Sequence, residues 1–490
     1  MNAFHKSINK NLKYNFSLSL LILIAGVMRF YGLTRQSYWW DEVLKFSFSA
    51  PQNDLYSVIK QTLDAAHPFA WNVLLWGWVK IIGYSEFSGR SMSAILGIIG
   101  ILCVYLLGKE LVDKQTGIYA SLIASLNAFL IQFSQDTTSY SLLFVMSTIS
   151  YLFFFKVTKK ARACYEIIPY IIFSIILCYT HYFGFIIIFT QFLNILIYLY
   201  IKPDKRKIIT SIFITSFFII LIFLFPLVTY LKDVVLSDGF NWIPKPSFIF
   251  FIYLIHSYTK VVVLDTMYVT LLLYSIYSII RNLKNNDQPY LMIALVTWLF
   301  AGFILPLLFS LLVSPVLIQR ATIIQIPAIV VLIAVGISNV PIKHVRTILL
   351  SIIVIFSFHA YKKYFFVPQK EQMREVLYTV YDRSESIPIY DFWYRREYLL
   401  DDTSHNDESF FTLYAKILDI DIKILPFDLL EKQYVSNNMP NKFWVIEAHQ
   451  DKMLSSEILH NNLVNQIKNY QFLAAQAVLY SYVRSPLVPG

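Results

Sequence analysis

Long runs of uncharged, mostly apolar residues recur along the first three quarters of the chain and limit its fold more than any other feature. A helix needs about 20 apolar residues to cross a bilayer. Ten runs approach or exceed this length, at 17–28, 91–108, 115–135, 137–155, 167–201, 208–231, 266–280, 288–319, 321–342 and 347–361. With 57% apolar and only 15% charged residues, the composition excludes an ordinary soluble domain. The sequence therefore predicts an α-helical polytopic membrane protein.

The number of membrane spans follows from the lengths of these runs. The run 167–201 is too long for one crossing, and its His181-Tyr182-Phe183-Gly184 stretch is the natural place for a turn, which gives eleven spans. The shorter segments 69–83 and 248–260 contain Lys80 and His256 and are expected to lie on the membrane surface. The first run ends at Met28-Arg29 rather than at small residues typical of signal cleavage, so it is expected to remain as a transmembrane helix.

The distribution of basic residues predicts the orientation in the membrane. Eleven spans place 17 of the 27 basic residues before residue 362 on the side of the N-terminus. The positive-inside rule identifies such a side as cytoplasmic. Residues 362–490 and the loops 34–90, 135–140 and 231–260 are then extracytoplasmic. This predicts a multi-pass protein of the cytoplasmic (inner) membrane.

The chain is expected to contain two domains. Residues 1–361 form a transmembrane domain with a first outer loop at 34–90, and they hold a net charge of +13, which indicates anionic lipid headgroups rather than nucleic acid. Residues 362–490 have a net charge of −3. Four short apolar segments, 387–390, 422–425, 443–446 and 475–483, alternate there with polar stretches, which predicts a small extracytoplasmic α/β domain.

The adjacent acids Asp41 and Glu42 follow three aromatic residues, Tyr38, Trp39 and Trp40, just after the first span. One interpretation is an interfacial aromatic belt with a solvated acidic pair. The other is a catalytic pair, because a partly desolvated carboxylate at the membrane surface can act as a general base toward a hydroxyl group. The two acids alone are compatible with both.

Further polar residues are expected on the same outer face, some of which also have a structural explanation as a helix start, a membrane anchor, a cap or a turn. They are His67, Arg90, Asp136, Tyr140, His181, Tyr182, Trp242 and Lys260. Arg320 is the only charged residue between Gln288 and Ile342. A guanidinium group in such a run is a candidate for binding a lipid phosphate, or else anchors the end of a span.

The order and spacing of these residues resemble those of glycosyltransferase family 39, the bacterial relatives of dolichyl-phosphate-mannose protein mannosyltransferases with the GT-C fold. The resemblance is close over about residues 20–200 and looser at 315–327. It rests on Trp40-Asp41-Glu42, His67-Pro68, the segments 82–94 and 105–109, Ser134-Gln135-Asp136 to Tyr140, Tyr179 to Gly184, and Gln319-Arg320 with Pro327.

The resemblance implies that the chain is an inverting membrane glycosyltransferase of the cell envelope. It would move a hexosyl or pentosyl group from a polyprenyl-phosphate carrier to a hydroxyl group of a lipid, glycan or protein. Asp41 corresponds to the catalytic base and Glu42 to its supporting partner. His67 corresponds to the loop histidine, and Arg320 to the cation near the carrier phosphate.

The chain departs from the family pattern at two positions. Phe69 follows His67-Pro68, where the family usually has a second proline, and Thr138 replaces an arginine usually found between Asp136 and Tyr140. A lipid-linked saccharide flippase or other transporter, a surface-polysaccharide polymerase or ligase, and a catalytically inactive GT-C protein are alternative hypotheses. Transporters often show duplicated halves and midplane sites, whereas no repeat is visible here. No cofactor is predicted, and no ligand spacing in the sequence requires a metal ion. Asp41, Glu42 and Asp136 are nevertheless compatible with a shared divalent cation.

Overall fold

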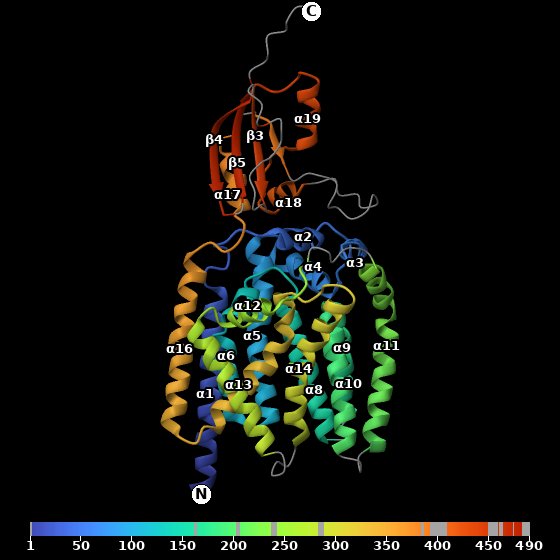
Figure 1. The fold of residues 1–490 in the computed structure, drawn as a ribbon, viewed down its shortest axis with the longest axis vertical. Helices are drawn as coiled ribbons and strands as arrows, with labels where there is room; N and C mark the ends of the chain where they lie inside the picture. The colour runs from blue at the N-terminus through green and yellow to red at the C-terminus, as the bar shows by residue number, and fades with distance from the viewer. Residues whose placement is uncertain are drawn as a thin grey trace, which may run out of the picture. The chain divides into compact units, whose positions relative to one another are not determined.

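A computed structural model describes most of the chain (Figure 1). The described residues are 2–160, 164–201, 206–236, 243–282, 289–383, 387–392, 409–448, 459, 464–473 and 475–482. They form two compact units. The first unit contains Met1–Tyr31, Ala66–Leu74 and Ser91–Lys363, and the second contains Gly32–Ala65, Leu75–Arg90 and Tyr364–Gly490.

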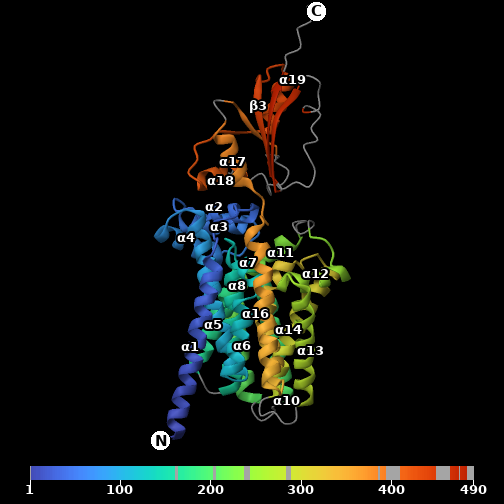
Figure 2. The same cartoon turned by 90° about the vertical axis from the view of Figure 1, so that its left-hand side faces the viewer.

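Long helices lying side by side make up the first unit (Figures 1 and 2). Eight described segments are long and apolar enough to cross a membrane. The helices involved are α1 (Asn2–Phe30), α5 (Glu86–Leu111), α8 (Tyr140–Lys160), α10 (Phe183–Ile201), α13 (Val262–Arg281), α14 (Pro289–Leu312), α15 (Ile326–Asn339) with the preceding 3-10 helix η4 (Gln319–Gln325), and α16 (Lys343–Phe366).

The remaining predicted runs also fall on helices. The run 115–135 is divided into α6 (Lys114–Ser125) and α7 (Ala128–Ser134), which are bent by 63° relative to each other. The other two are α9 (Cys164–Thr180), which ends at the predicted turn, and α11 (Arg206–Leu236). The two segments excluded as spans form the short helices α4 (Ala70–Ile82) and α12 (Phe248–Thr259). Among the described residues, eight helices qualify as spans, or nine if the bent pair is one span, against the eleven expected; α9 and α11 contain only shorter apolar stretches. The predicted α-helical polytopic membrane architecture is confirmed.

Burial distinguishes the centre of the first unit from its periphery. Of the most apolar window in each span, 83% is buried in α8 and 89% in η4 with α15, against 11% in α1 and 22% in α16. Helices that are apolar on all sides belong either in a protein core or in lipid. We infer that α8 and α15 form the centre of the helix bundle, whereas α1 and α16 present most of their surface to lipid.

The second unit contains a five-stranded sheet in the order β2-β1-β3-β5-β4. β1 is parallel to β2 and β3, whereas β5 is antiparallel to β3 and β4. The strands are β1 (Ile389–Asp391), β2 (Ile424–Pro426), β3 (Lys442–Ala448), β4 (Val464–Phe472) and β5 (Ala475–Tyr482). The helices that lie wholly in this unit are α2 (Trp40–Phe48), α3 (Leu55–Asp64), α17 (Met373–Tyr381), α18 (Phe410–Ile417) and α19 (Phe427–Val435).

Inward-facing residues of β3 and β5 form the apolar core of the sheet. Phe443 and Val445 alternate along β3 and pack with Val478 and Tyr480 of β5. The intervening residues Trp444 and Ile446 are buried as well, so β3 is covered on both faces. The small C-terminal α/β domain predicted from the short apolar segments is therefore confirmed in its fold.

Candidate active site

Asp41 and Glu42 lie in the first turn of α2 in the second unit. Trp39 precedes the helix in an extended conformation, and its backbone N–H donates to Glu42 Oε2 at 3.4 Å. Acidic side chains in a first turn are stabilised by the free N–H groups and by the helix dipole. The Asp41 side chain is half-buried, whereas Glu42 is completely buried.

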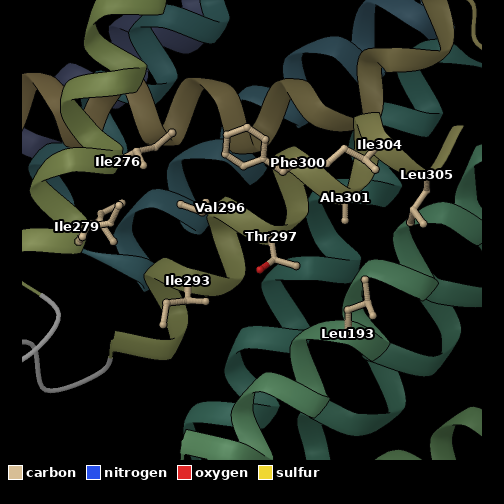
Figure 3. Close-up of a pocket in the computed structure, with 11 residues that line it drawn as sticks. Leu193, Ile276, Ile279, Ile293, Val296, Thr297, Phe300, Ala301, Ile304 and Leu305 are labelled. Atoms are coloured by element: carbon tan, nitrogen blue, oxygen red, sulfur yellow. The ribbon is translucent and has the colours of Figure 1, made fainter. Parts of the chain in front are cut away.

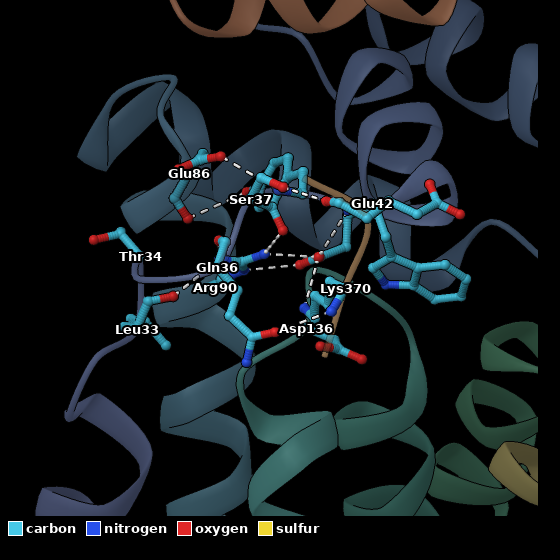
Figure 4. A network of polar contacts seen from close by, with 12 residues as sticks. Leu33, Thr34, Gln36, Ser37, Glu42, Glu86, Arg90, Asp136 and Lys370 are labelled. Atoms are coloured by element: carbon cyan, nitrogen blue, oxygen red, sulfur yellow. Dashed lines mark hydrogen bonds and ion pairs between the residues drawn. The ribbon is translucent and has the colours of Figure 1, made fainter. Parts of the chain in front are cut away.

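Arg90 binds both carboxylate oxygens of Glu42 (Figure 4). Its Nε donates to Oε1 at 2.9 Å and its Nη2 to Oε2 at 2.8 Å. The remaining N–H groups donate to backbone oxygens: Nη1 to Leu33 and Gln36 at 3.0 and 2.6 Å, and Nη2 to Ser37 at 2.9 Å. All five guanidinium donors are thus used inside the second unit. Arg90 therefore connects the loop 33–37 to α2 by hydrogen bonds.

Lys370 is a second cation on Glu42, and its contribution was not predicted from the sequence. Lys370 Nζ lies 2.8 Å from Glu42 Oε2, and the backbone N–H groups of Gln369 and Lys370 donate to Gln36 Oε1 at 2.8 and 3.1 Å. Burial acts to raise the pKa of the Glu42 carboxyl, but the charges and hydrogen bonds of Arg90 and Lys370 outweigh burial and lower this pKa to about 2. Glu42 is therefore ionised throughout the physiological pH range.

A second ion pair joins the same parts of the chain. Arg374 Nη1 lies 2.6 Å from Glu86 Oε2, and the Tyr414 hydroxyl donates to Glu86 Oε1. Arg374 also donates to the backbone oxygens of Thr34 and Arg35 at 2.9 and 3.0 Å. The loop that precedes α2 is consequently fixed by side chains from the C-terminal region as well as by Arg90.

Asp136, Tyr140, His181 and Tyr182 belong to the first unit. The Asp136 side chain is buried, and its backbone oxygen accepts a hydrogen bond from Ser93 Oγ at 2.5 Å. The rings of Tyr140 and His181 lie 5.8 Å apart. The Phe183 N–H donates to His181 Nδ1 at 3.1 Å, which assigns the proton of the neutral ring to Nε2.

The hydroxyl groups of Tyr182 and Thr138 differ in their surroundings. Burial raises the pKa of Tyr182 to about 12, so its phenol stays protonated and able to donate at neutral pH. Thr138, at the position of the family arginine, is completely buried. Its hydroxyl has no hydrogen-bond partner among the residues that the structure describes. The cation that the resemblance implies at this position is therefore replaced by a small buried side chain.

The other predicted residues of the first unit lie on separate segments. His67 is half-buried just before α4, and Lys260 ends α12 in a left-handed conformation with φ 62°. Arg320 is half-buried in the first turn of η4. The Tyr258 hydroxyl donates to Thr322 Oγ1 at 2.8 Å and so connects α12 to η4. Trp242 lies outside the described residues.

A lateral groove of the first unit is lined almost entirely by hydrocarbon side chains (Figure 3). It lies between α10, α13 and α14, has a volume of about 430 Å³, and includes Phe300, Ala301 and Ile304 of α14. Thr297 is its one polar lining side chain. The groove is suited to an apolar chain rather than to a sugar.

Comparisons with known proteins identify the architecture. Residues 66–230, about a third of the chain, match the dolichyl-phosphate-mannose-protein mannosyltransferase family. The crystal structure of ArnT from Cupriavidus metallidurans bound to undecaprenyl phosphate is similar, with a TM-score of 0.60, 11% identity, and coverage of 94% of this chain and 97% of that chain. The chain has the GT-C fold. The resemblance drawn from the sequence is thereby confirmed.

The solved structure of an archaeal protein is also similar to this chain. Archaeal oligosaccharyltransferase AglB from Archaeoglobus fulgidus, in complex with an inhibitory peptide and a dolichol-phosphate, matches with a TM-score of 0.58 and 11% identity. The match covers 98% of this chain and 75% of AglB. No curated protein matches the sequence itself. At these identities the likeness establishes the GT-C fold and leaves the reaction to be argued from the residues.

Sequence reasoning missed Lys370, Arg374 and Tyr414 as partners of the acidic residues in this GT-C protein. They lie in a polar region whose local pattern indicates only surface helices and strands, so no nearby signal marked them. Within the described residues, no three His, Cys, Asp or Glu side chains gather into a group able to hold a metal ion. That the protein needs no metal stays a prediction from the sequence.

Proposed function

We propose that the chain transfers a sugar, with inversion, from a polyprenyl-phosphate carrier to an acceptor hydroxyl group on the extracytoplasmic face of the cytoplasmic membrane. The GT-C fold, the mannosyltransferase match over residues 66–230 and the spans support a membrane glycosyltransferase. The observation that carries the proposal is the anchored first turn of α2, which holds Asp41 beside a completely buried Glu42.

The environment of the two acids assigns them different roles in this proposal. Glu42 accepts from Arg90 and Lys370, and its pKa of about 2 makes it a poor proton acceptor. Asp41 is half-buried on the same helical turn, and its carboxylate is the second acid that this turn presents. We assign Asp41 as the general base toward the acceptor hydroxyl. Glu42 and Arg90 become positioning residues that fix the helix bearing Asp41.

The carrier is proposed to bind the first unit. Its long isoprenoid chain matches the chemistry of the apolar groove at Ala301, and its phosphate matches a guanidinium group such as Arg320. The similar structures that hold undecaprenyl phosphate and dolichol-phosphate support this class of ligand. A cation at the phosphate stabilises the negative charge that develops on the leaving group.

A transfer assay tests the proposed function directly. Purified protein in lipid nanodiscs is incubated with radiolabelled polyprenyl-phosphate sugars and a membrane and envelope extract. We expect label to enter one acceptor fraction while polyprenyl phosphate is released in equal amount. The fraction that becomes labelled identifies the acceptor as lipid, glycan or protein. Absence of both products with every sugar tested, while labelled carrier crosses the bilayer of proteoliposomes, would instead support a flippase.

Substitution of Arg320 tests the site of the carrier phosphate. We expect Arg320→Gln to raise KM for the polyprenyl-phosphate donor by about tenfold or more, because a charge-assisted hydrogen bond is worth about 1.5–3 kcal/mol. Arg320→Lys keeps the charge but not the fork, so it should recover part of the loss. Arg281, an exposed arginine in the last turn of α13, provides the matched control. Equal effects of Arg281→Gln and Arg320→Gln would contradict the assignment.

A further inference from the structure

The break between α6 and α7 lies inside the apolar first unit and leaves backbone groups to be satisfied. The two helices are bent by 63°, with Leu126 and Asn127 between them. Asn127 caps α7 by accepting from the Leu130 N–H at 2.9 Å. The last carbonyl groups of α6, in contrast, need donors from elsewhere, because lipid offers none.

Arg29 of α1 supplies donors to the end of α6. Its Nη1 and Nη2 donate to the backbone oxygens of Ser125 and Ala124 at 3.3 and 3.4 Å. The Arg29 side chain is completely buried. A cation at a helix C-terminus is favoured by the helix dipole. Tyr361 of α16 completes the arrangement by donating to the Leu126 oxygen.

Gln135 makes the opposite connection, from the end of α7 back to the end of α1. Its Nε2 donates to the backbone oxygens of Tyr31, Arg29 and Met28 at 2.9, 3.1 and 3.4 Å. Arg29 of α1 thus caps the end of α6, and Gln135, directly after α7, caps the end of α1. We call Arg29 and Gln135 the reciprocal brace.

A glycine of α5 makes the close packing around the brace possible. A Cβ atom at Gly97 would lie 2.2 Å from Ser134 Oγ and 2.7 Å from Arg29 Nε. Both distances are too short for any side chain. Arg29 and the end of α7 thus occupy the space that a larger residue at position 97 would need.

We propose that Arg29 and Gln135 are positioning residues that set the place and direction of Asp136. This inference rests on the proposed function insofar as Asp136 is expected to contact substrate. Asp136 follows Gln135 directly, and α7 is a short helix attached to α6 through a bend. The brace fixes the far end of α7 to α1, which defines where the following carboxylate lies. Arg29 itself is completely buried and is not a ligand for substrate.

Hydrogen exchange and kinetics on the same variants test the brace. Arg29→Met and Gln135→Met should increase amide exchange in residues 128–139 of the full chain in nanodiscs, because each removes one half of the brace. They should lower kcat by about tenfold or more and leave KM for the donor within about twofold, since a displacement of about 1 Å is enough for a large loss in rate. Arg29→Lys keeps the charge and should recover part of both losses.

Tyr361→Phe is the matched control, because it removes a hydrogen bond to the same break and keeps the side-chain donors of both Arg29 and Gln135. We expect near-normal exchange in residues 128–139 and near-normal kcat for this variant. The same losses in Tyr361→Phe as in Arg29→Met, or unchanged exchange in both brace variants, would overturn the proposal. If the wild-type chain transfers no sugar, the exchange measurement still decides the brace, and only the proposed function fails.

Discussion

Replacement of Asp41 by asparagine is expected to lower sugar transfer by about 10²–10⁴-fold, the usual contribution of a general base. Asparagine has nearly the same shape but cannot take the proton of the acceptor hydroxyl. The loss should fall on kcat, with KM for the donor little changed, because the assigned role of Asp41 is proton transfer. The measurement is the initial rate of label transfer at saturating donor in nanodiscs.

Folding effects of this substitution should be small and separable. Asp41 is half-buried in a first helical turn, so loss of its charge costs about 0.3–1 kcal/mol. Asp64→Asn, at the exposed end of α3 in the same outer loop, changes an acid of the same type and should leave the rate unaltered. An active Asp41→Asn variant would require another base, and an equally inactive Asp64→Asn variant would indicate a general effect of charge on the loop.

The positions of the membrane helices could be predicted because the bilayer imposes a length on every span. Run length separated α9 from α10 at residues 181–184, and the charges within the segments together with the positive-inside rule excluded α4 and α12. The bend between α6 and α7 was not predicted, because the run 115–135 contains no charge, no proline and no glycine near the break. Asn127, which caps α7, was the one local signal of a new helix start.

The strands that could be predicted were those with apolar sequences. The apolar segments around Phe443 and Ala475 form β3 and β5. β4 was missed, because Asn465, Gln466 and Lys468 give it a polar sequence. It lies at the edge of the sheet, where exposed and charged residues discourage pairing with another chain. A pattern of hydrophobicity therefore misses a polar edge strand such as β4, whereas it detected the apolar edge strand β2 at 422–425.

The candidate site was predictable in its acids but not in their partners. Asp41 and Glu42 stood out because carboxylates beside interfacial aromatics are unusual enough to be noticed in sequence. Arg90 was predicted as a substrate-binding residue, and the sequence did not indicate that Glu42 and three backbone oxygens accept from all five of its donors. Lys370 is 328 residues from Glu42 in sequence. Such a pairing depends on tertiary structure and leaves no local trace.

Breaking the Glu42–Arg90 pair is expected to destabilise the second unit by about 3–5 kcal/mol, because a buried charge is left without its partner. Both side chains are almost completely inaccessible to solvent, with exposures of 0% and 1%. Glu42→Gln leaves the two cations without a counter-charge. Arg90→Met leaves Glu42 with Lys370 alone and removes the donors of the loop 33–37. Urea dependence of proteolysis within the second unit measures both effects.

A double-mutant cycle separates the ion pair from general packing. Glu42→Gln combined with Arg90→Met should lower the free energy of unfolding by clearly less than the sum of the single variants. In the double variant, neither member of the pair remains as a charge without its partner. Lys370→Met should cost less than either single variant, since Arg90 still neutralises Glu42. Strictly additive losses would show that Glu42 and Arg90 contribute independently to stability and do not act as an ion pair.

The pH dependence provides a further test with a definite sign. The folded Glu42 carboxyl has a pKa of about 2, against an ordinary value of 4.5, so acid protonates the unfolded chain first. The stabilisation is therefore complete above pH 4.5 and is lost as the pH falls toward 2. The difference in unfolding free energy between wild type and Glu42→Gln should be constant from about pH 5 upward and should narrow below it. A change in this difference near neutral pH would contradict the low pKa of Glu42 and with it the separation of roles between Glu42 and Asp41.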